Sequence, residues 1–214
     1  MIELARRRMM MGGSAKPYDA EVEYLDSSGT QWIDTGVYGS NTLVVSMEIN
    51  VLVEYAKSPD AEIIGSVSDR WNGIRRGYEF LYATKSSRAF AWWYEKHESI
   101  PCNIYIGNKC SITISNGVFS IKDYTGVNHT INIAQSGSFT TSTTLPIFAT
   151  RNPDMRFSSQ LRVYSVQMKR NGVTILDFIP VRKNGVGYMY DKVSGQLFGN
   201  QGEGQFIIGP DKTA

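Results

Sequence analysis

Three carboxylates near the start of the sequence have a spacing that could support glycoside hydrolysis. Glu21, Glu23 and Asp26 lie in the segment EVEYLD, at positions i, i+2 and i+5. Residues i and i+2 of a strand share one face, and a β-bulge could bring the third carboxylate to it. Glycosidases use such a pair, one as acid and the other as base or nucleophile. We favour the alternative, solvent-facing carboxylates on a terminal strand, because the segment lies at the edge of the expected domain.

Other catalytic or metal-binding arrangements lack the residues they need. The sequence has 2 His and 2 Cys, and no G-x-S-x-G segment. Without C-x-x-C or H-x₃₋₅-H spacing, these residues cannot form a tetrahedral zinc cluster. Calcium held by loop oxygens stays open, with RNPD at 151–154 or SPD at 58–60 as possible ligands. We expect no catalytic residue and no cofactor.

Carbohydrate binding is the functional alternative that the aromatic residues favour. The segment SDRWNGIRRGY places Trp71 on an expected loop with Arg75 and Arg76. Sugars bind to aromatic faces through their C–H surfaces and to polar groups through their hydroxyls. These three residues are therefore candidate ligand-binding residues, and the alternative is that Trp71 caps the edge of the sheet.

A second aromatic segment, RAFAWWYEK, adds two candidates. Strand alternation places Phe90, Trp92 and Tyr94 on one face and Trp93 with Glu95 on the other. We expect the bulkier set to face the core, which leaves Trp93 exposed beside Glu95 as a ligand-binding pair. The alternative is that Trp93 packs beneath a loop.

The elements that position these residues are expected to be β-strands. Aromatic residues, with 12 Tyr, 9 Phe and 4 Trp, stand among many Thr, Ser, Val and Ile. TLVVSMEINVLVEY, residues 42–55, alternates apolar and polar side chains over 14 residues, which predicts one long strand. Further strands are expected at 20–25, 31–35, 61–67, 77–83, 88–95, 104–107, 110–115, 117–123, 128–133, 145–150, 160–169, 173–180, 186–190 and 204–208. The absence of helical intervals predicts an all-β, two-sheet antiparallel sandwich.

Glycine-rich segments are expected to form turns. Asn171-Gly172 and Asn184-Gly185 are typical of tight hairpin turns, because both residue types tolerate a positive φ. The segment GNQGEGQF lacks the order of a phosphate-binding loop. Around Gly107-Asn108 a hairpin would offset Cys102 from Cys110, so we expect two reduced thiols.

The N-terminal segment differs from the rest. Residues 2–11 predict a short helix that ends at Gly12-Gly13, so that 1–16 form an arm and linker and 17–214 the sandwich domain. An isolated helix this short is marginal in water, so it needs a partner surface. The candidate docking residues are Arg6, Arg7, Arg8, Met9 and Met10. The alternative is a solvated basic face.

Both ends of the expected domain resemble a known family. YDAEVEYLDSSGTQWIDTGV and DFIPVRKNGVGYMYDKVSGQLFGNQGEGQFIIG are similar to the two ends of concanavalin A-like, laminin-G-like domains in proteins of gut bacteria and their phages. The resemblance implies a jelly roll whose first and last strands lie side by side, attached to a larger assembly. The carboxylates of EVEYLD also resemble the E-x-D-x-x-E strand of glucanases in this fold, with changed identities.

These observations favour a non-enzymatic recognition or structural module of a phage-type virion or surface assembly, with a glycan as ligand. The alternatives are a glucanase-like hydrolase and an assembly protein without a ligand. A net charge of +2 gives no field that indicates nucleic acid, and no apolar run is long enough to span a membrane. Without a secretory h-region, we expect synthesis in a cytoplasm and assembly or self-association through the arm.

Overall fold

The computed structural model describes residues 16–52, 60–67, 77–83, 87–102, 104, 107–134, 137–151 and 156–213. The helix expected over 2–11, with the candidate docking residues Arg6 to Met10, lies outside this part of the chain. The described residues contain no α-helix. Among them, therefore, no helix could cross a membrane.

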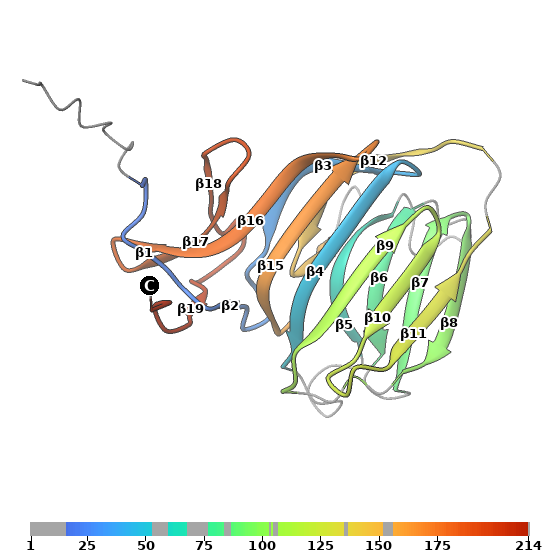
Figure 1. Ribbon diagram of the computed structural model, residues 1–214, viewed down its shortest axis with the longest axis horizontal. Coiled ribbons are helices and arrows are strands. Elements are labelled where there is room, and N and C mark those ends of the chain that lie inside the picture. Colours follow the sequence, from blue (N-terminus) through green and yellow to red (C-terminus); the bar gives the residue numbers. More distant parts are fainter. Residues whose placement is uncertain are drawn as a thin grey trace, which may run out of the picture.

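Two sheets form the described part of the molecule (Figure 1). The first sheet has eleven strands there: β1 Ala20–Glu21, β2 Leu25–Asp26, β4 Leu43–Val51, β9 Cys110–Ser115, β10 Val118–Lys122, β11 Asn128–Asn132, β15 Leu161–Arg170, β16 Val173–Lys183, β17 Val186–Asp191, β18 Leu197–Phe198 and β19 Ile207–Ile208. Its main path runs β11-β10-β9-β4-β15-β16-β17-β18. Strands β1, β2 and β19 join beside β15 and β16.

The second sheet has eight strands within the described residues: β3 Ile33–Ser40, β5 Asp60–Val67, β6 Gly77–Ala83, β7 Arg88–Tyr94, β8 Lys96–Pro101, β12 Thr140–Ile147, β13 Ala149–Arg151 and β14 Arg156–Ser158. Its main path runs β14-β13-β5-β6-β7-β8, and β12 joins β3 to β5. Among the pairings of these strands, β13 beside β5 is parallel and the others are antiparallel. The expected all-β class and two-sheet sandwich are confirmed.

The core lies between the two sheets. Strand β4 alternates as predicted, with Leu43, Val45, Met47 and Ile49 buried. Phe80 of the second sheet stacks on Phe119 of the first, with ring centroids 6.1 Å apart. Each large apolar side chain buried in this way contributes about 1.5–3 kcal/mol. The inner faces of the two sheets therefore hold the layers together.

Strand β4 is shorter than predicted. It spans nine residues, Leu43–Val51, and ends before Leu52, whereas residues 53–55 of the predicted strand lie outside the described residues. The amide of Leu52 donates to the carbonyl of Gln160, and the carbonyl of Val51 accepts from the amide of Gly107. The backbone groups at this end therefore bond to loop residues, which ends the strand pairing.

Strand β8 was not expected. Its sequence, KHESIP, is mostly exposed and has no apolar alternation. It pairs with β7 from Arg88↔Pro101 to Trp93↔Lys96, after a turn in which Tyr94 has a φ of 58°. An edge strand can carry charged side chains because it needs only backbone partners on one side. Its pairing therefore comes from β7 and not from its own pattern.

The turns and the chain ends follow the sequence more closely. Asn171-Gly172 and Asn184-Gly185 have φ values of 51° and 80°, and of 50° and 76°, as predicted for these hairpin turns. Near the termini, β2 pairs with β19 through Leu25↔Ile208 and Asp26↔Ile207. The two ends of the domain thus lie side by side through β2 and β19, as the family resemblance implies, although the first strand, β1, pairs with β16.

Candidate functional site: a polar pocket at the end of β3

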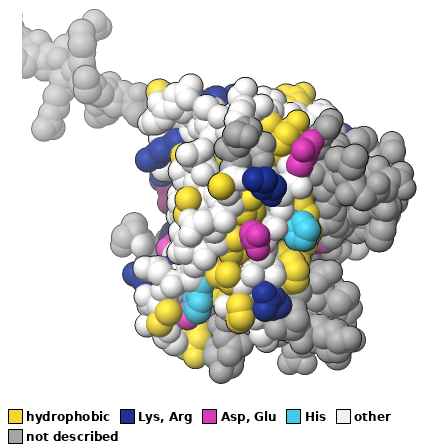
Figure 2. Space-filling view, turned by 90° about the vertical axis from the view of Figure 1, so that its right-hand side faces the viewer, with side chains coloured by type: hydrophobic (Ala, Val, Ile, Leu, Met, Phe, Trp, Pro, Cys, Tyr) yellow, Lys and Arg dark blue, Asp and Glu magenta, His cyan; other side chains and the backbone are white. Residues whose placement is uncertain are grey.

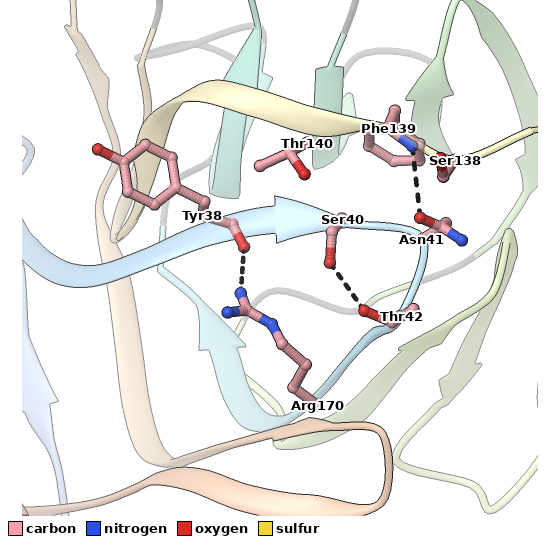
Figure 3. A pocket seen from close by; sticks show the side chains of 8 residues that line it. All are labelled: Tyr38, Ser40, Asn41, Thr42, Ser138, Phe139, Thr140 and Arg170. Carbon is pink, nitrogen blue, oxygen red and sulfur yellow. Dashed lines mark hydrogen bonds between the residues drawn. The ribbon is translucent and has the colours of Figure 1, made fainter.

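A pocket of about 470 Å³ opens where the end of β3 meets the start of β12 and the end of β15. Four hydroxyl side chains, one amide, two aromatic rings and one guanidinium line it (Figure 3): Tyr38, Ser40, Asn41, Thr42, Ser138, Phe139, Thr140 and Arg170. Most of these groups can form hydrogen bonds and carry no charge. The pocket is therefore suited to a polyhydroxylated ligand.

Strand pairing brings these segments together. Ser40 pairs with Thr140 across β3 and β12, and Leu43 pairs with Arg170 across β4 and β15. The register of β12 against β3 shifts between Thr140 and Thr144. Such an irregularity bends a strand locally and redirects its side chains. The β3–β4 turn, at Asn41 and Thr42, thus lies between the two other segments of the pocket.

Gly39 allows β3 to approach the core closely at this point. A Cβ atom here would lie 2.7 Å from the Cβ of Tyr78 and 3.0 Å from the Cγ2 of Thr141. The amide of Gly39 donates to the Oγ1 of Thr141 at 2.9 Å. Tyr78 is fully buried beneath it, and burial raises the pKa of its hydroxyl well above the ordinary value. The pocket wall formed by β3 therefore lies directly on the core.

Hydrogen bonds order the polar side chains of the pocket. The Nη2 of Arg170 donates to the carbonyl of Tyr38 at 2.9 Å. The Oδ1 of Asn41 accepts from the amide of Phe139 at 3.3 Å, and the hydroxyls of Ser40 and Thr42 lie 3.2 Å apart. Figure 3 shows the turn linked to Phe139 through Asn41, and β3 linked to Arg170 through the Tyr38 carbonyl. These hydrogen bonds partly fix the lining before a ligand binds. The Nδ2 of Asn41 and the Nη1 of Arg170 take no part in them and can donate to a ligand.

The two aromatic rings have different roles. Tyr38 is 46% exposed, whereas Phe139 is 8% exposed. The Phe139 ring packs on Trp93 and stacks on Tyr94, at centroid distances of 5.1 and 5.3 Å. Tyr38 is thus the ring available to a ligand, and Phe139 joins the pocket to the core.

The expected exposure of Trp93 is wrong. Its side chain is 1% exposed, and the outer face of β7 carries Phe90, Trp92 and Tyr94, each half-buried. On the inner face, Ala89 and Ala91 pair with Tyr82 and Phe80, and Trp93 pairs with Tyr78. The bulk of the neighbouring strand fills the layer beside the two alanines. Space on the inner face of β7 therefore remains for two small side chains and one large one. The sizes of the side chains in β7 alone do not reveal which of its faces is buried.

The other predicted ligand-binding residues do not line this pocket or lie outside the described residues. Glu95 is exposed in the turn between β7 and β8. Trp71, Arg75 and Arg76 belong to a part of the chain that the structure does not describe. No prediction included Tyr38, Asn41 or Arg170. The available signal was the turn sequence YGSNT and the Arg before an Asn-Gly turn, which are common features of hairpins.

The three N-terminal carboxylates have separate environments. Asp26 is 6% exposed and accepts two hydrogen bonds from Arg162, at 2.7 and 2.8 Å. Hydrogen bonds from Lys16 and then Tyr18 lower the pKa of Glu21. Glu23 is exposed and lines a smaller cavity of about 310 Å³, together with Tyr164 and other residues. Asp26 is therefore held in an ion pair, which does not favour a catalytic role.

A third cavity lies between the sheet edges formed by β8 and β11. The volume of this cavity is about 500 Å³. The Nζ of Lys96, which lines it, donates a hydrogen bond to the carbonyl of Ala134 at 2.8 Å. On this side of the molecule, hydrophobic, basic and acidic side chains are interspersed (Figure 2). Among the described side chains in this view, neither sign of charge predominates.

The described residues contain no group of three or more His, Cys, Asp or Glu side chains that could hold a metal ion. The proposed calcium ligands at 58–60 and 152–154 have no described side chains. Arg151, at the start of the RNPD segment, pairs with Asp34 at 3.3 Å.

No protein-family model matches the chain. No curated protein matches its sequence. Among solved structures, a candidate carbohydrate-binding protein from Bacteroides ovatus is similar with a TM-score of 0.53 and 10% identity, over 90% of this chain and 61% of that one.

Two further solved structures are less similar. The enzymatically active domain of tailspike protein 2 of bacteriophage CBA120 has a TM-score of 0.40 and 10% identity, over 64% of this chain and 23% of that one. A Trypanosoma rangeli sialidase mutant with trans-sialidase activity has a TM-score of 0.39 and 8% identity, over 60% and 21%. This chain spans less than two thirds of each of the three proteins. The likeness to the Bacteroides protein shows a shared β-sandwich fold.

Proposed function

We propose that this β-sandwich is a non-enzymatic recognition module that binds carbohydrate in the pocket at the end of β3. The observation that carries the proposal is the combination of an exposed ring, Tyr38, with four hydroxyl side chains, Asn41 and Arg170 around one cavity of about 470 Å³. Sugars present both apolar C–H faces and many hydroxyls, and such a lining can contact both.

The chemistry of the pocket supports a sugar over an apolar ligand. Amphipathic rings such as tyrosine contact one face of a ligand while leaving its polar edge in water. Planar amides and hydroxyls donate and accept hydrogen bonds from fixed directions. Because Asn41 is bonded to Phe139, its Nδ2 is held in place as a donor. Tyr38 would therefore supply contact area, and Asn41 would supply orientation.

The fold is consistent with this role. The Bacteroides ovatus protein that shares it is designated a candidate carbohydrate-binding protein. Because the two sequences are only 10% identical, this likeness concerns the fold and not the ligand. The proposal of carbohydrate binding therefore rests on the residues of the pocket. The pairing of the terminal strands β2 and β19 also supports membership of the concanavalin A-like, laminin-G-like jelly rolls.

The module would belong to a larger assembly, of the virion or cell-surface type. The basic and Met-rich segment at Arg6 to Met10 is its proposed docking element, because a short helix needs a partner surface for stability. Deleting residues 1–13 is expected to leave the melting temperature of the sandwich unchanged and to abolish assembly, measured by light scattering. Unfolding of the shortened chain would contradict this arrangement.

A glycan-binding assay tests the central proposal. The protein would be screened on an array of bacterial and host glycans, and positive ligands titrated by calorimetry. Tyr38→Ala is expected to weaken binding about tenfold, which corresponds to about 1.4 kcal/mol. The matched control is Tyr124→Ala, because Tyr124 is 49% exposed but lies on the β10–β11 turn.

The two variants separate the possible outcomes. Binding that is lost in Tyr38→Ala and kept in Tyr124→Ala would support the pocket as the site. Equal effects of both substitutions, or no glycan bound by the intact chain, would contradict it and favour an assembly protein without a ligand. Release of reducing sugar from β-glucans, abolished by Glu21→Gln, would instead indicate the hydrolase alternative.

A further inference from the structure

We infer that the pocket at the end of β3 recognises an acidic glycan, whose carboxylate or sulfate group binds to the guanidinium of Arg170. This inference rests on the proposed carbohydrate-binding function and names its ligand class. It follows from the charge of the pocket, from the bonding of Arg170 and from the position of Arg170 beside Tyr38.

Among the described residues, the lining of the pocket has one charged side chain. Arg170 is cationic, and the other seven lining residues are neutral. None of these lining residues is an aspartate or glutamate, so among the described side chains a neutral sugar would find no carboxylate to accept its hydroxyl protons. The amide nitrogen of Asn41 and the hydroxyls of Ser138 and Thr140 can donate hydrogen bonds. The lining therefore favours a ligand rich in acceptors and negative charge.

Among the described residues, Arg170 has no carboxylate partner, whereas two other arginines of the same sheet do. Arg162 pairs with Asp26, and Arg182 pairs with Asp211, at 2.7 and 2.8 Å. Within the described residues, no carboxylate lies within ion-pair distance of Arg170. Arg88 also has no carboxylate partner there, but it makes three hydrogen bonds to Ser99. To the described residues, the guanidinium of Arg170 makes a single hydrogen bond, to the carbonyl of Tyr38.

That hydrogen bond fixes the guanidinium at the pocket. Its Nη2 holds the Tyr38 carbonyl, and its buried Nε has no hydrogen-bond partner. In Figure 3 the other terminal nitrogen has no marked bond to the residues drawn. A half-buried cation with unused donors gains from a bound anion, because charge-assisted hydrogen bonds are stronger than neutral ones. The Nη1 group is thus the donor that remains for a ligand.

The same contact places the charge beside the backbone of the residue that carries the exposed ring, and the ring itself points away from the guanidinium (Figure 3). Arg170 bonds to the backbone of Tyr38 itself, and the Tyr38 side chain lines the same cavity. An oligosaccharide that contacts the ring with one sugar can therefore present a carboxylate or sulfate of a neighbouring sugar to the guanidinium. A free inorganic anion would use Arg170 but not Tyr38. The pairing of ring and charge favours an acidic sugar over a simple anion.

The test compares matched ligands. Oligogalacturonate, the corresponding carboxyl-reduced neutral oligosaccharide and a sulfated form of that oligosaccharide would be titrated calorimetrically into the full chain. Inorganic phosphate and acetate would be titrated separately. The wild-type protein is expected to bind at least one of the two acidic ligands about tenfold more tightly than the neutral one, with this preference decreasing as salt concentration rises.

Substitutions assign the preference to Arg170. Arg170→Gln is expected to abolish the preference for the acidic ligand over the neutral one, and Arg170→Lys is expected to retain part of that preference. Arg88→Gln is the matched control, and we expect this variant to keep the preference for the acidic ligand. Circular dichroism and melting temperature would show that each variant is folded. A preference that survives in Arg170→Gln would overturn the inference.

The outcomes also separate this inference from the proposed function. Equal binding of neutral and acidic sugars, weakened by Tyr38→Ala, would overturn the acidic preference and leave carbohydrate binding intact. Binding of phosphate or acetate as tight as that of the acidic sugars would also overturn it. Binding of none of the sugars would contradict the proposed function for these ligands and the inference with it.

Discussion

The indole of Trp93 packs edge-on against the ring of Phe139, with centroids 5.1 Å apart and an interplanar angle of 87°. Trp93 belongs to the core, and Phe139 lines the pocket at the end of β3. Trp93 also packs edge-on against Phe119 of the opposite sheet, with ring centroids 5.9 Å apart. One buried side chain thus connects both sheets to the pocket, in the region where the sequence predicted an exposed ligand contact.

Trp93→Ala is expected to lower the free energy of unfolding by about 3–5 kcal/mol, because it leaves a large cavity between the sheets. Glycan binding should weaken as well, since Phe139 loses its support. Guanidinium unfolding followed by circular dichroism measures the first effect. Val173→Ala is the control, because Val173 is 65% exposed, and it should change stability by less than about 0.5 kcal/mol. Similar stability of both variants would show that Trp93 is not a core residue.

Gly117→Ala and Gly172→Ala compare a crowded glycine with an uncrowded one that has nearly the same backbone conformation. Their φ values are 77° and 80°, so alanine is strained at both, by about 1–2 kcal/mol. A Cβ at Gly117 would collide with the carbonyl oxygen of Ile133, whereas nothing lies within 4 Å at Gly172. Gly117→Ala should therefore have the lower urea midpoint. Equal midpoints would contradict the close approach of Ile133.

Asp26→Asn is expected to destabilise the protein by about 3 kcal/mol, because Arg162 would lose its buried carboxylate partner. Asp211→Asn breaks a bidentate pair with Arg182 at the surface and should have a much smaller effect. Thermal unfolding of both variants at neutral pH measures the difference. A larger loss in Asp211→Asn would contradict the structural role assigned to Asp26.

The Asp123–His129 pair is expected to make the β10–β11 hairpin sensitive to acid. Hydrogen bonds from His129 and then Thr125 lower the pKa of Asp123 from 3.8 to about 2. Because the folded pKa lies below the unfolded one, this stabilisation is present above about pH 4 and is lost as the pH falls through about 2. The stability difference between wild type and Asp123→Asn should fade over that interval. A difference that is independent of pH would contradict the pair.

The two cysteines are expected to be unreactive in the folded protein. Both are buried and free, and burial raises the pKa of Cys102 to about 11 and that of Cys110 to about 12. Few thiolates therefore exist near neutral pH, and reagents have little access to them. Ellman's reagent should label both thiols only after denaturation. Rapid labelling of the native chain would contradict their burial.

The sequence by itself determined the all-β class, most strand positions and the hairpin turns. Alternation along 43–51 predicted which side chains of β4 face the core, and Asn-Gly pairs predicted two tight turns. Both signals are local: a strand presents side chains to alternate faces, and a positive φ favours few residue types. The resemblance of the chain ends also predicted that the two ends of the domain pair with each other, as β2 and β19 do.

Only the tertiary structure decided which face of β7 is buried and where a pocket forms. The inner face of β7 follows from the volumes of Tyr78, Phe80 and Tyr82 on the neighbouring strand, which the pattern of β7 does not contain. The pocket joins Tyr38, Phe139 and Arg170, which lie far apart in the sequence. Local periodicity fixes the direction of a side chain, but its neighbours depend on long-range strand pairing. The register of β3 with β12 and of β4 with β15 therefore creates the site.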